Sequence, residues 1–190
     1  MLSPAAIRDN LKGWVTTHLS KDVNDVLIEE LGFVNRQEGR SVDMTFRADL
    51  AVANGRLVAF EIKSGADTLK RWPSQCDAYF NVFDEVWLCT HGRHLEKALE
   101  VTPKGVGILV ADDLGGLVLL RNAKPNRQAN AYDLTGLLWR EELDALCEQN
   151  GIVVKKKETK AEVRGKVSGS VPIDSIRSCV LACLKDRKGG

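Results

Sequence analysis

Three charged side chains near the middle of the chain have types and spacing suited to phosphate chemistry. Asp49 opens one short apolar run, and Glu61 and Lys63 close the next, with Asn54-Gly55 between the runs. Two carboxylates can hold Mg²⁺ while water and phosphate take the other coordination positions. Such a metal polarises a phosphoryl oxygen, and a nearby lysine can orient the attacking water. The alternative is that both acids only cap strand ends and that Lys63 is their ion-pair partner.

The two apolar runs predict a β-hairpin made of residues 47–53 and 56–63. Asn-Gly between such runs is typical of a two-residue type I′ turn, which needs positive φ at both positions. A turn of that length sets Ala53 opposite Arg56. The hairpin therefore brings the outer ends of the two strands to the same edge of the sheet.

The predicted register leaves the two acids on different faces. It pairs Asp49 with Phe60, and side chains alternate between faces along a strand. Glu61 and Lys63 share one face, whereas Asp49 is offset from them. We therefore expect a bulge or a bend near Asp49 if the two carboxylates are to converge.

The rest of the chain alternates helical and strand patterns. The segment 33–45 is polar and predicts a loop or a weak strand. A linker follows residue 150 and contains a short helix, for which Thr159 and Glu162 form a capping box. The other expected elements are helices at 4–19, 23–31 (ended by Gly32), 68–83 (delayed by Pro73), 92–101, 133–149 and from Pro172 onward, and strands at 86–90, 106–113 and 117–122.

An early hairpin followed by helical crossovers gives antiparallel and parallel strand pairs in one sheet. The expected fold is therefore α/β, a mixed β-sheet flanked by helices, with a helical C-terminal extension. The expected division is a domain at residues 1–150 and a basic linker with helices at residues 151–190.

The pattern D-x(11)-E-I-K after an Asn-Gly hairpin resembles the PD-(D/E)xK nuclease superfamily, with Asp49, Glu61 and Lys63 at the motif positions. Gln75 and Tyr79 form Q-x(3)-Y on the following helix, which is similar to the RecB-like branch. Ala48 stands where the motif's proline would be. The acid that this branch carries upstream matches Glu30 on the helix before the hairpin, or its neighbour Glu29.

Longer stretches of the chain resemble a family of small, mostly uncharacterised bacterial and phage-borne members of that superfamily. These stretches are VLIEELG, RADLAVANG, EIKSGADTLKRWPSQCDAYFNVFDEVWLCT and LLWREEL. The resemblance covers roughly residues 23–150. It implies a restriction-endonuclease-like core and a nuclease that hydrolyses phosphodiester bonds, in DNA rather than RNA. The alternative is a protein on the same fold that binds nucleic acid or takes part in an assembly without cleaving.

The resemblance also implies the roles of the site residues. Mg²⁺ or Mn²⁺ would be held by Asp49, Glu61 and the carbonyl of Ile62, with Glu30 assisting through water. Lys63 would orient the nucleophilic water. Gln75 and Tyr79 would support Lys63 or the phosphate.

Basic side chains are the expected contacts to the nucleic-acid backbone, because phosphates supply most of the affinity. Arg47 lies two residues before Asp49, and Lys70 and Arg71 begin the helix that carries Gln75. Residues 155–190 hold ten Lys and Arg against four Asp and Glu, and Lys155, Lys156 and Lys157 open that segment. The alternative for Lys70, Arg71 and the basic segment is a solvated surface, and the alternative for Arg47 is an ion pair with Asp49. His91 and His94 could pass for a metal pair, but no third ligand accompanies them.

Composition limits the class of protein. Hydrophobic residues make up 44% and charged residues 28% of the 190, which is typical of a globular chain. No apolar run is long enough to cross a membrane, and the N-terminus has no apolar signal region. The five cysteines are scattered, so we expect buried thiols in a reducing cytoplasm. A homo-oligomer is compatible with the sequence.

Overall fold

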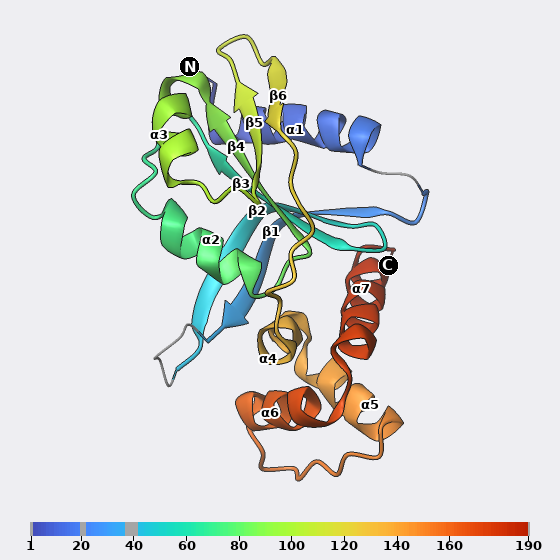
Figure 1. Ribbon diagram of the computed structural model, residues 1–190. Helices are drawn as coiled ribbons and strands as arrows, with labels where there is room; N and C mark the ends of the chain where they lie inside the picture. The colour runs from blue at the N-terminus through green and yellow to red at the C-terminus, as the bar shows by residue number, and fades with distance from the viewer. Residues whose placement is uncertain (1, 20–21, 37–41, 190) are drawn as a thin grey trace.

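The computed structural model describes residues 2–19, 22–36 and 42–189 (Figure 1). The described residues form one mixed sheet of six strands in the order β1-β2-β3-β4-β5-β6. The strands are β1 (Val26–Asn35), β2 (Met44–Ala53), β3 (Leu57–Lys63), β4 (Glu85–His91), β5 (Gly107–Ala111) and β6 (Leu117–Arg121). The helices are α1 (Pro4–His18), α2 (Trp72–Phe80), α3 (Leu95–Val101), α4 (Ala131–Leu134), α5 (Arg140–Gln149), α6 (Lys160–Ser170) and α7 (Ile173–Gly189), with short 3₁₀ turns η1 (Gly92–His94) and η2 (Thr135–Leu137).

The pairing within the sheet follows from the connections. β1, β2 and β3 form an antiparallel meander, because short turns can join only antiparallel neighbours. β3, β4 and β5 are parallel, since α2 and then α3 supply the crossovers between them. β6 returns antiparallel to β5. The predicted α/β fold with a mixed sheet and a helical C-terminal part is confirmed.

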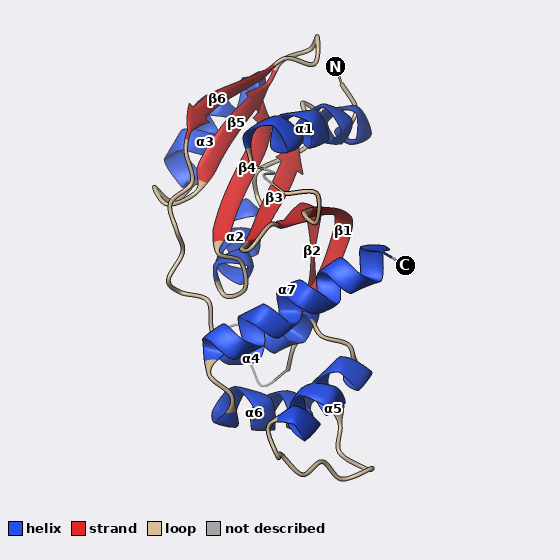
Figure 2. Cartoon of the chain, turned by 90° about the vertical axis from the view of Figure 1, so that its right-hand side faces the viewer, coloured by secondary structure: helices blue, strands red, loops and turns tan. Residues whose placement is uncertain are grey.

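Helices cover both faces of the sheet (Figure 2). α1 lies on one face, where Ile7, Leu11 and Val15 pack against a buried cluster that includes Phe60 and Trp87. α2, α3 and the C-terminal helices lie on the other face and share a larger buried cluster. β3 and β4 are buried along their whole length, and each carries an apolar run, residues 57–60 and 86–89, as fully buried parallel strands do.

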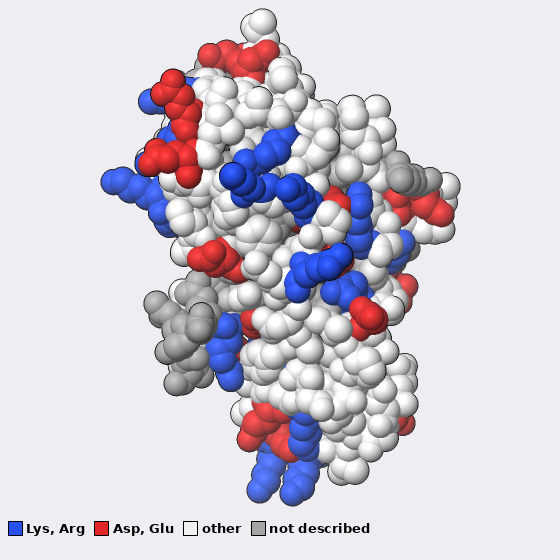
Figure 3. Space-filling model, in the orientation of Figure 1, with Lys and Arg blue, Asp and Glu red and all other residues white. Residues whose placement is uncertain are grey.

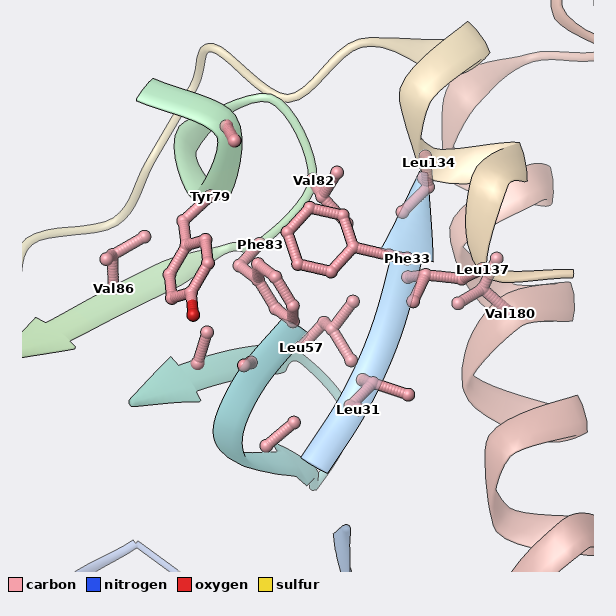
Figure 4. Close-up of a cluster of buried hydrophobic side chains, with 14 of the residues drawn as sticks. Leu31, Phe33, Leu57, Tyr79, Val82, Phe83, Val86, Leu134, Leu137 and Val180 are labelled. Carbon is pink, nitrogen blue, oxygen red and sulfur yellow. The ribbon is translucent and has the colours of Figure 1, made fainter. Parts of the chain in front are cut away.

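The C-terminal helices belong to the larger cluster. Figure 4 shows Leu137 and Val180 beside β1, in the buried cluster that also holds Leu31 and Phe33. Val180 of α7 is fully buried. The apolar face of β1 is therefore covered by helices that come more than a hundred residues later in the chain.

A buried arginine connects α6 to the segment just before β2. Arg164 is almost fully buried and forms an ion pair with Asp43, which precedes β2. Its guanidinium donates to the carbonyl of Tyr132 at 2.9 Å and lies over the Tyr132 ring. A buried cation without such partners would be strongly unfavourable, so this network fixes the position of α6.

Most predicted elements are present, with two corrections. Residues 23–31 were predicted to be a helix ended by Gly32, but β1 runs through this segment as a strand. The predicted helix 133–149 is interrupted, since η2 ends at Leu137 and α5 begins at Arg140, and Trp139 between them is exposed. The late start of α2 at Pro73 and the Thr159–Glu162 capping box are confirmed.

Three of the five cysteines are buried, and the other two lie close together on α7. Cys76, Cys89 and Cys147 are buried free thiols, as expected, whereas Cys179 and Cys183 are half-buried neighbours on α7. Across the described ranges, no helix combines the length and the apolar character that crossing a bilayer requires.

Candidate active site

The turn between β2 and β3 sets the position of both acids. Ala53 faces Leu57, so the turn contains three residues, and only Gly55 has positive φ (87°). The predicted two-residue type I′ turn, with Ala53 opposite Arg56, is therefore wrong by one position. Three-residue turns with glycine in the left-handed region are the next most common hairpin connection.

This change of one position brings the acids together. Leu50 and Phe60 form the last pair of the β2–β3 ladder, and a regular continuation by one residue would set Asp49 across from Glu61. Paired residues of an antiparallel ladder point to the same face. The bend that we expected near Asp49 is present: Ala48 and Ala51 pack in the same buried cluster although they lie three residues apart, so the alternation of faces breaks at Asp49. Glu30, which stands level with Asp49 on β1, has a φ of 55° at the same place.

Lys63 is held by two side chains from different elements. It is almost fully buried, and its Nζ donates to Glu61 Oε1 and, at 3.1 Å, to Gln75 Oε1 on α2. Gln75 and Tyr79 lie one helical turn apart, so both reach the end of β3. The lysine that the sequence predicted for the site is therefore fixed by the glutamine that the same motif predicted.

Tyr79 reaches the other oxygen of Glu61. Its Oη lies 2.6 Å from Glu61 Oε2 and 2.8 Å from the carbonyl oxygen of Arg47, and its single proton serves both acceptors. Burial, followed by the charge of Glu61, raises the pKa of Tyr79 well above its usual value. Tyr79 is thus a permanent hydrogen-bond donor that orients Glu61.

Glu30 reaches the same face from β1, not from a helix as predicted. Its neighbours in the chain pair with Leu50 and Ala48, so Glu30 stands level with Asp49. Its φ is 55°, which is strained for a residue with a side chain and occurs mostly at functional sites. The structure places Glu30 in the cleft, whereas Glu29 turns away to Lys12 on α1.

Two arginines hold Glu30. Arg8 Nη2 of α1 lies 2.8 Å from Glu30 Oε1, and Arg47 Nε lies 2.5 Å from Glu30 Oε2. Oε2 is buried and has no hydrogen bond of good geometry among the described residues. Glu30 is therefore placed by charge attraction more than by directed hydrogen bonds.

These side chains line one cleft of about 570 Å³. Its walls come from the first turn of α1, from β1, β2 and β3, and from the loop and first turn of α2. The lining residues are Pro4, Arg8, Glu30, Thr45, Phe46, Arg47, Asp49, Glu61, Ile62, Lys63, Asp67, Arg71, Ser74 and Gln75. Sequence reasoning missed Arg8 and Asp67, because neither belongs to the motif and both are ordinary polar residues in their segments.

The electrostatics of Asp49 are unusual. Its Oδ2 accepts a hydrogen bond from the backbone N–H of Ile62 at 2.7 Å. Burial, and then the charge of Glu61, raise the pKa of Asp49 to about 6, although the Ile62 N–H and Lys63 oppose the shift. Two carboxylates held side by side in a partly buried cleft repel each other, and a bound cation relieves that repulsion.

The donor set fits a hydrated divalent cation. Asp49 and Glu61 offer carboxylate oxygens, and the carbonyl of Ile62 points to the same side as its N–H, which is bonded to Asp49. Within the described segments, no three His, Cys, Asp or Glu side chains already form a metal cluster. Mg²⁺ commonly takes only one or two carboxylates and keeps several waters, so the cleft suits it better than a metal that needs a protein cage.

The predicted basic contacts divide into two groups. Arg47 and Arg71 line the cleft, and exposed Lys70 is adjacent to Arg71. Residues 155–157 lie in the loop between α5 and α6, at the opposite end of the molecule from the start of α2 (Figure 1). The structure therefore does not bring the three lysines to the cleft.

The two histidines serve the local structure. His94 Nε2 lies 3.1 Å from the carbonyl oxygen of Ser64, and Arg93 Nη1 donates to that of Gly65 at 2.6 Å. His91 contacts Asp113. These contacts fix the backbone just after Lys63.

Fold and cleft together define an α/β protein with a mixed six-stranded sheet and an acid- and lysine-lined cleft at the end of β3. The chain belongs to the family of bacteriophage P4 protein cII, whose pattern matches residues 9–189. That match covers nearly the whole chain, the C-terminal helices included.

Two relatives illustrate the range of similarity. Protein cII of Enterobacteria phage P4 is 28% identical over 144 residues, which are 74% of this chain and 54% of that protein. The chain thus aligns with about half the length of this curated relative. A solved structure of a protein of unknown function from Silicibacter pomeroyi has a TM-score of 0.47 and 16% identity, covering 83% of this chain and 99% of that one.

Proposed function

We propose that this phage-family protein is a Mg²⁺- or Mn²⁺-dependent phosphodiesterase that cleaves DNA. The observation that supports this most is the convergence of Asp49, Glu61 and Lys63 in one cleft, with Gln75 holding the lysine. The resemblance of these residues to the PD-(D/E)xK pattern favours the same reaction class. The resemblance also favours DNA over RNA.

The residues of the cleft would have different roles in the reaction. Asp49, Glu61 and the Ile62 carbonyl would hold the metal, which when bound polarises the scissile phosphate and acidifies a water. Lys63 Nζ lies beside Glu61, where it can orient the attacking water and offset the charge that develops on the phosphate. Arg47 and Arg71 at the cleft would contact neighbouring phosphates.

A panel of labelled substrates tests the proposal. Linear, circular and single-stranded DNA, and RNA of the same sequence, are incubated with the protein in Mg²⁺, Mn²⁺ or EDTA. We expect DNA cleavage with either metal, none in EDTA, and none with Asp49→Ala, whose fold is checked by circular dichroism. Cleavage that persists in EDTA or in folded Asp49→Ala would overturn the metal-dependent mechanism, and cleavage of RNA alone would overturn the substrate.

A second function has its own support. Both oxygens of Glu61 already have partners, in Lys63 and Tyr79, and Glu30 is paired with arginines, so the acids are engaged without a metal. A protein that only binds nucleic acid through this cleft would keep such ion pairs. DNA binding of equal strength in EDTA and Mg²⁺, with no cleavage in any metal, would favour this second function.

A further inference from the structure

The strand β6 forms one edge of the sheet and is unusually apolar for an edge. It pairs with β5 on one side, and no described strand lies on its other side. Val118, Leu119 and Leu120 are 62%, 42% and 45% exposed, and Leu114 in the preceding turn is 96% exposed. Edge strands normally carry lysines, prolines or bulges that stop further pairing. β6, Leu-Val-Leu-Leu-Arg, has no lysine or proline, but it carries one bulge: Ile108 faces Arg121 and Leu109 faces Leu119, so Leu120 has no partner on β5.

The other edge of the sheet is treated differently. η2 and α7 pack along β1, and Figure 2 shows α7 beside β1 and β2, whereas the far side of β6 is open. The one charge on β6 is also withdrawn from the edge. Arg121 donates to the carbonyl oxygens of Val106 and Pro103, at 2.8 and 2.9 Å. The exposed backbone of β6 is thus left with apolar side chains around it.

The two ends of β6 carry opposite charge. Asp112 and Asp113 lie in the turn that precedes β6, and Lys124 lies just after its other end, beyond Arg121, whose guanidinium is bonded within its own chain. Figure 3 shows acidic side chains gathered over the β5–β6 turn and basic side chains below it, over the end of β6 and the link that follows. A strand that is apolar in the middle, acidic at one end and basic at the other complements itself when it is turned around.

We propose that β6 pairs antiparallel with β6 of a second copy of this chain, giving a two-fold symmetric dimer with a continuous sheet. Pairing centred on Leu119, just before the bulge at Leu120, brings the acidic turn of each copy toward Lys124 of the other. The same surface then serves both partners, as a two-fold interface requires. A parallel pairing would instead place like charges together at both ends.

The dimer leaves the candidate active site open. β6 is separated from β3 by two strands, and the cleft is formed at β1, β2 and β3. The proposal therefore stands apart from the proposed function. An interface built on five residues per strand is small, so we expect a dimer that dissociates with a Kd of about 1–100 µM.

Analytical ultracentrifugation of the whole chain over that concentration range tests the proposal. We expect a monomer–dimer equilibrium for the parent and a loss of dimer by at least tenfold in Kd for Val118→Lys with Leu120→Lys. Both side chains are exposed, so the variant should keep its fold. Val153→Lys, at another exposed apolar position (78%), is the matched control and should dimerise as the parent does.

A cross-link tests the register. In a Cys179→Ser, Cys183→Ser background, Leu119→Cys should form a disulfide-linked dimer under mild oxidation, because residue 119 faces its own copy. Leu114→Cys is more exposed but should not cross-link, since it faces position 124. A chain that stays monomeric throughout, a dimer that survives the two lysines, or equal cross-linking at both positions would each overturn the proposal.

Discussion

At the scale of single residues, the fold disfavours the ionised form of the Asp49 carboxyl group. Its pKa of about 6 in the fold lies above the usual 3.8, because burial and the charge of Glu61 disfavour its ionised form. For an acid whose folded pKa is raised, protonation stabilises the fold below pH 3.8, and this stabilisation is lost as the pH rises through 6. Near neutral pH and without metal, ionised Asp49 therefore destabilises the protein.

Asp49→Asn should stabilise the metal-free protein by about 1–2 kcal/mol at pH 7.5, because the amide is neutral and can still accept from the Ile62 N–H. Urea unfolding in EDTA at several pH values measures this. The difference between variant and parent should shrink below pH 6 and vanish near pH 4. Mg²⁺ should stabilise the parent but not the variant. A variant that is less stable than the parent at pH 7.5 in EDTA would contradict this view of the site.

Glu30 and Glu29 offer a comparison between adjacent acids. Glu30→Gln should reduce the metal-dependent cleavage rate by about 10–100-fold, because it removes the carboxylate that stands level with Asp49 beside the metal position. The Glu29→Gln variant should cleave DNA at the parent rate, since Glu29 faces Lys12 and lies outside the cleft. The DNA cleavage rates of both variants in Mg²⁺ test this difference. Equal losses of cleavage rate would show that the two acids act only on the stability of the fold.

At the scale of elements, the sequence predicted the hairpin, the parallel strands and the helix that carries Gln75. It failed at β1, because Leu and Glu favour helices and their spacing in VLIEELG fits one, whereas pairing with β2 decides the strand. It also misjudged the hairpin register. Asn-Gly favours the two-residue turn, and the choice of three residues depends on which faces the rest of the sheet buries.

Candidate residues were easier to predict than their arrangement. Asp49, Glu61, Lys63 and Gln75 were found from spacing and motif, and all four line the cleft. Arg8 could not be found, since its role depends on how α1 lies across the sheet.

The contact between η2 and β1 gives a sharp prediction at this scale. A Cβ on Gly136 would lie 2.1 Å from the carbonyl oxygen of Val34, so β1 or η2 would have to shift. Gly136→Ala should lower the free energy of unfolding by about 1–3 kcal/mol. Gly165→Ala on α6, where nothing lies within 4 Å of the added methyl, should instead be neutral or stabilise by up to about 1 kcal/mol. Thermal unfolding compares them, and equal effects would contradict this packing.

At the scale of the whole molecule, the C-terminal helices complete the core of the sheet. Val180 and Leu184 of α7 are buried in the same cluster as Leu31 and Phe33 of β1. A fragment of residues 1–150 would expose these apolar side chains to water.

That fragment should aggregate or lose cooperative unfolding, because it loses the packing of α6 and α7 and the ion pair of Arg164 with Asp43. Urea titration followed by tryptophan fluorescence measures this. In the full chain, Val180→Ala should cost about 1–3 kcal/mol. A soluble fragment that unfolds cooperatively at the urea midpoint of the full chain would show that residues 1–150 fold on their own.

The proposed phosphodiesterase activity depends on Lys63, a buried cation of the cleft that donates to Glu61. The most direct test is the single-turnover rate of DNA cleavage in Mg²⁺ for Lys63→Ala, beside Lys97→Ala at an exposed position on α3. We predict a loss of about 10²–10⁴-fold for Lys63→Ala and the parent rate for Lys97→Ala. Cleavage by folded Lys63→Ala at the parent rate, or no cleavage by the parent in any divalent metal, would contradict the account.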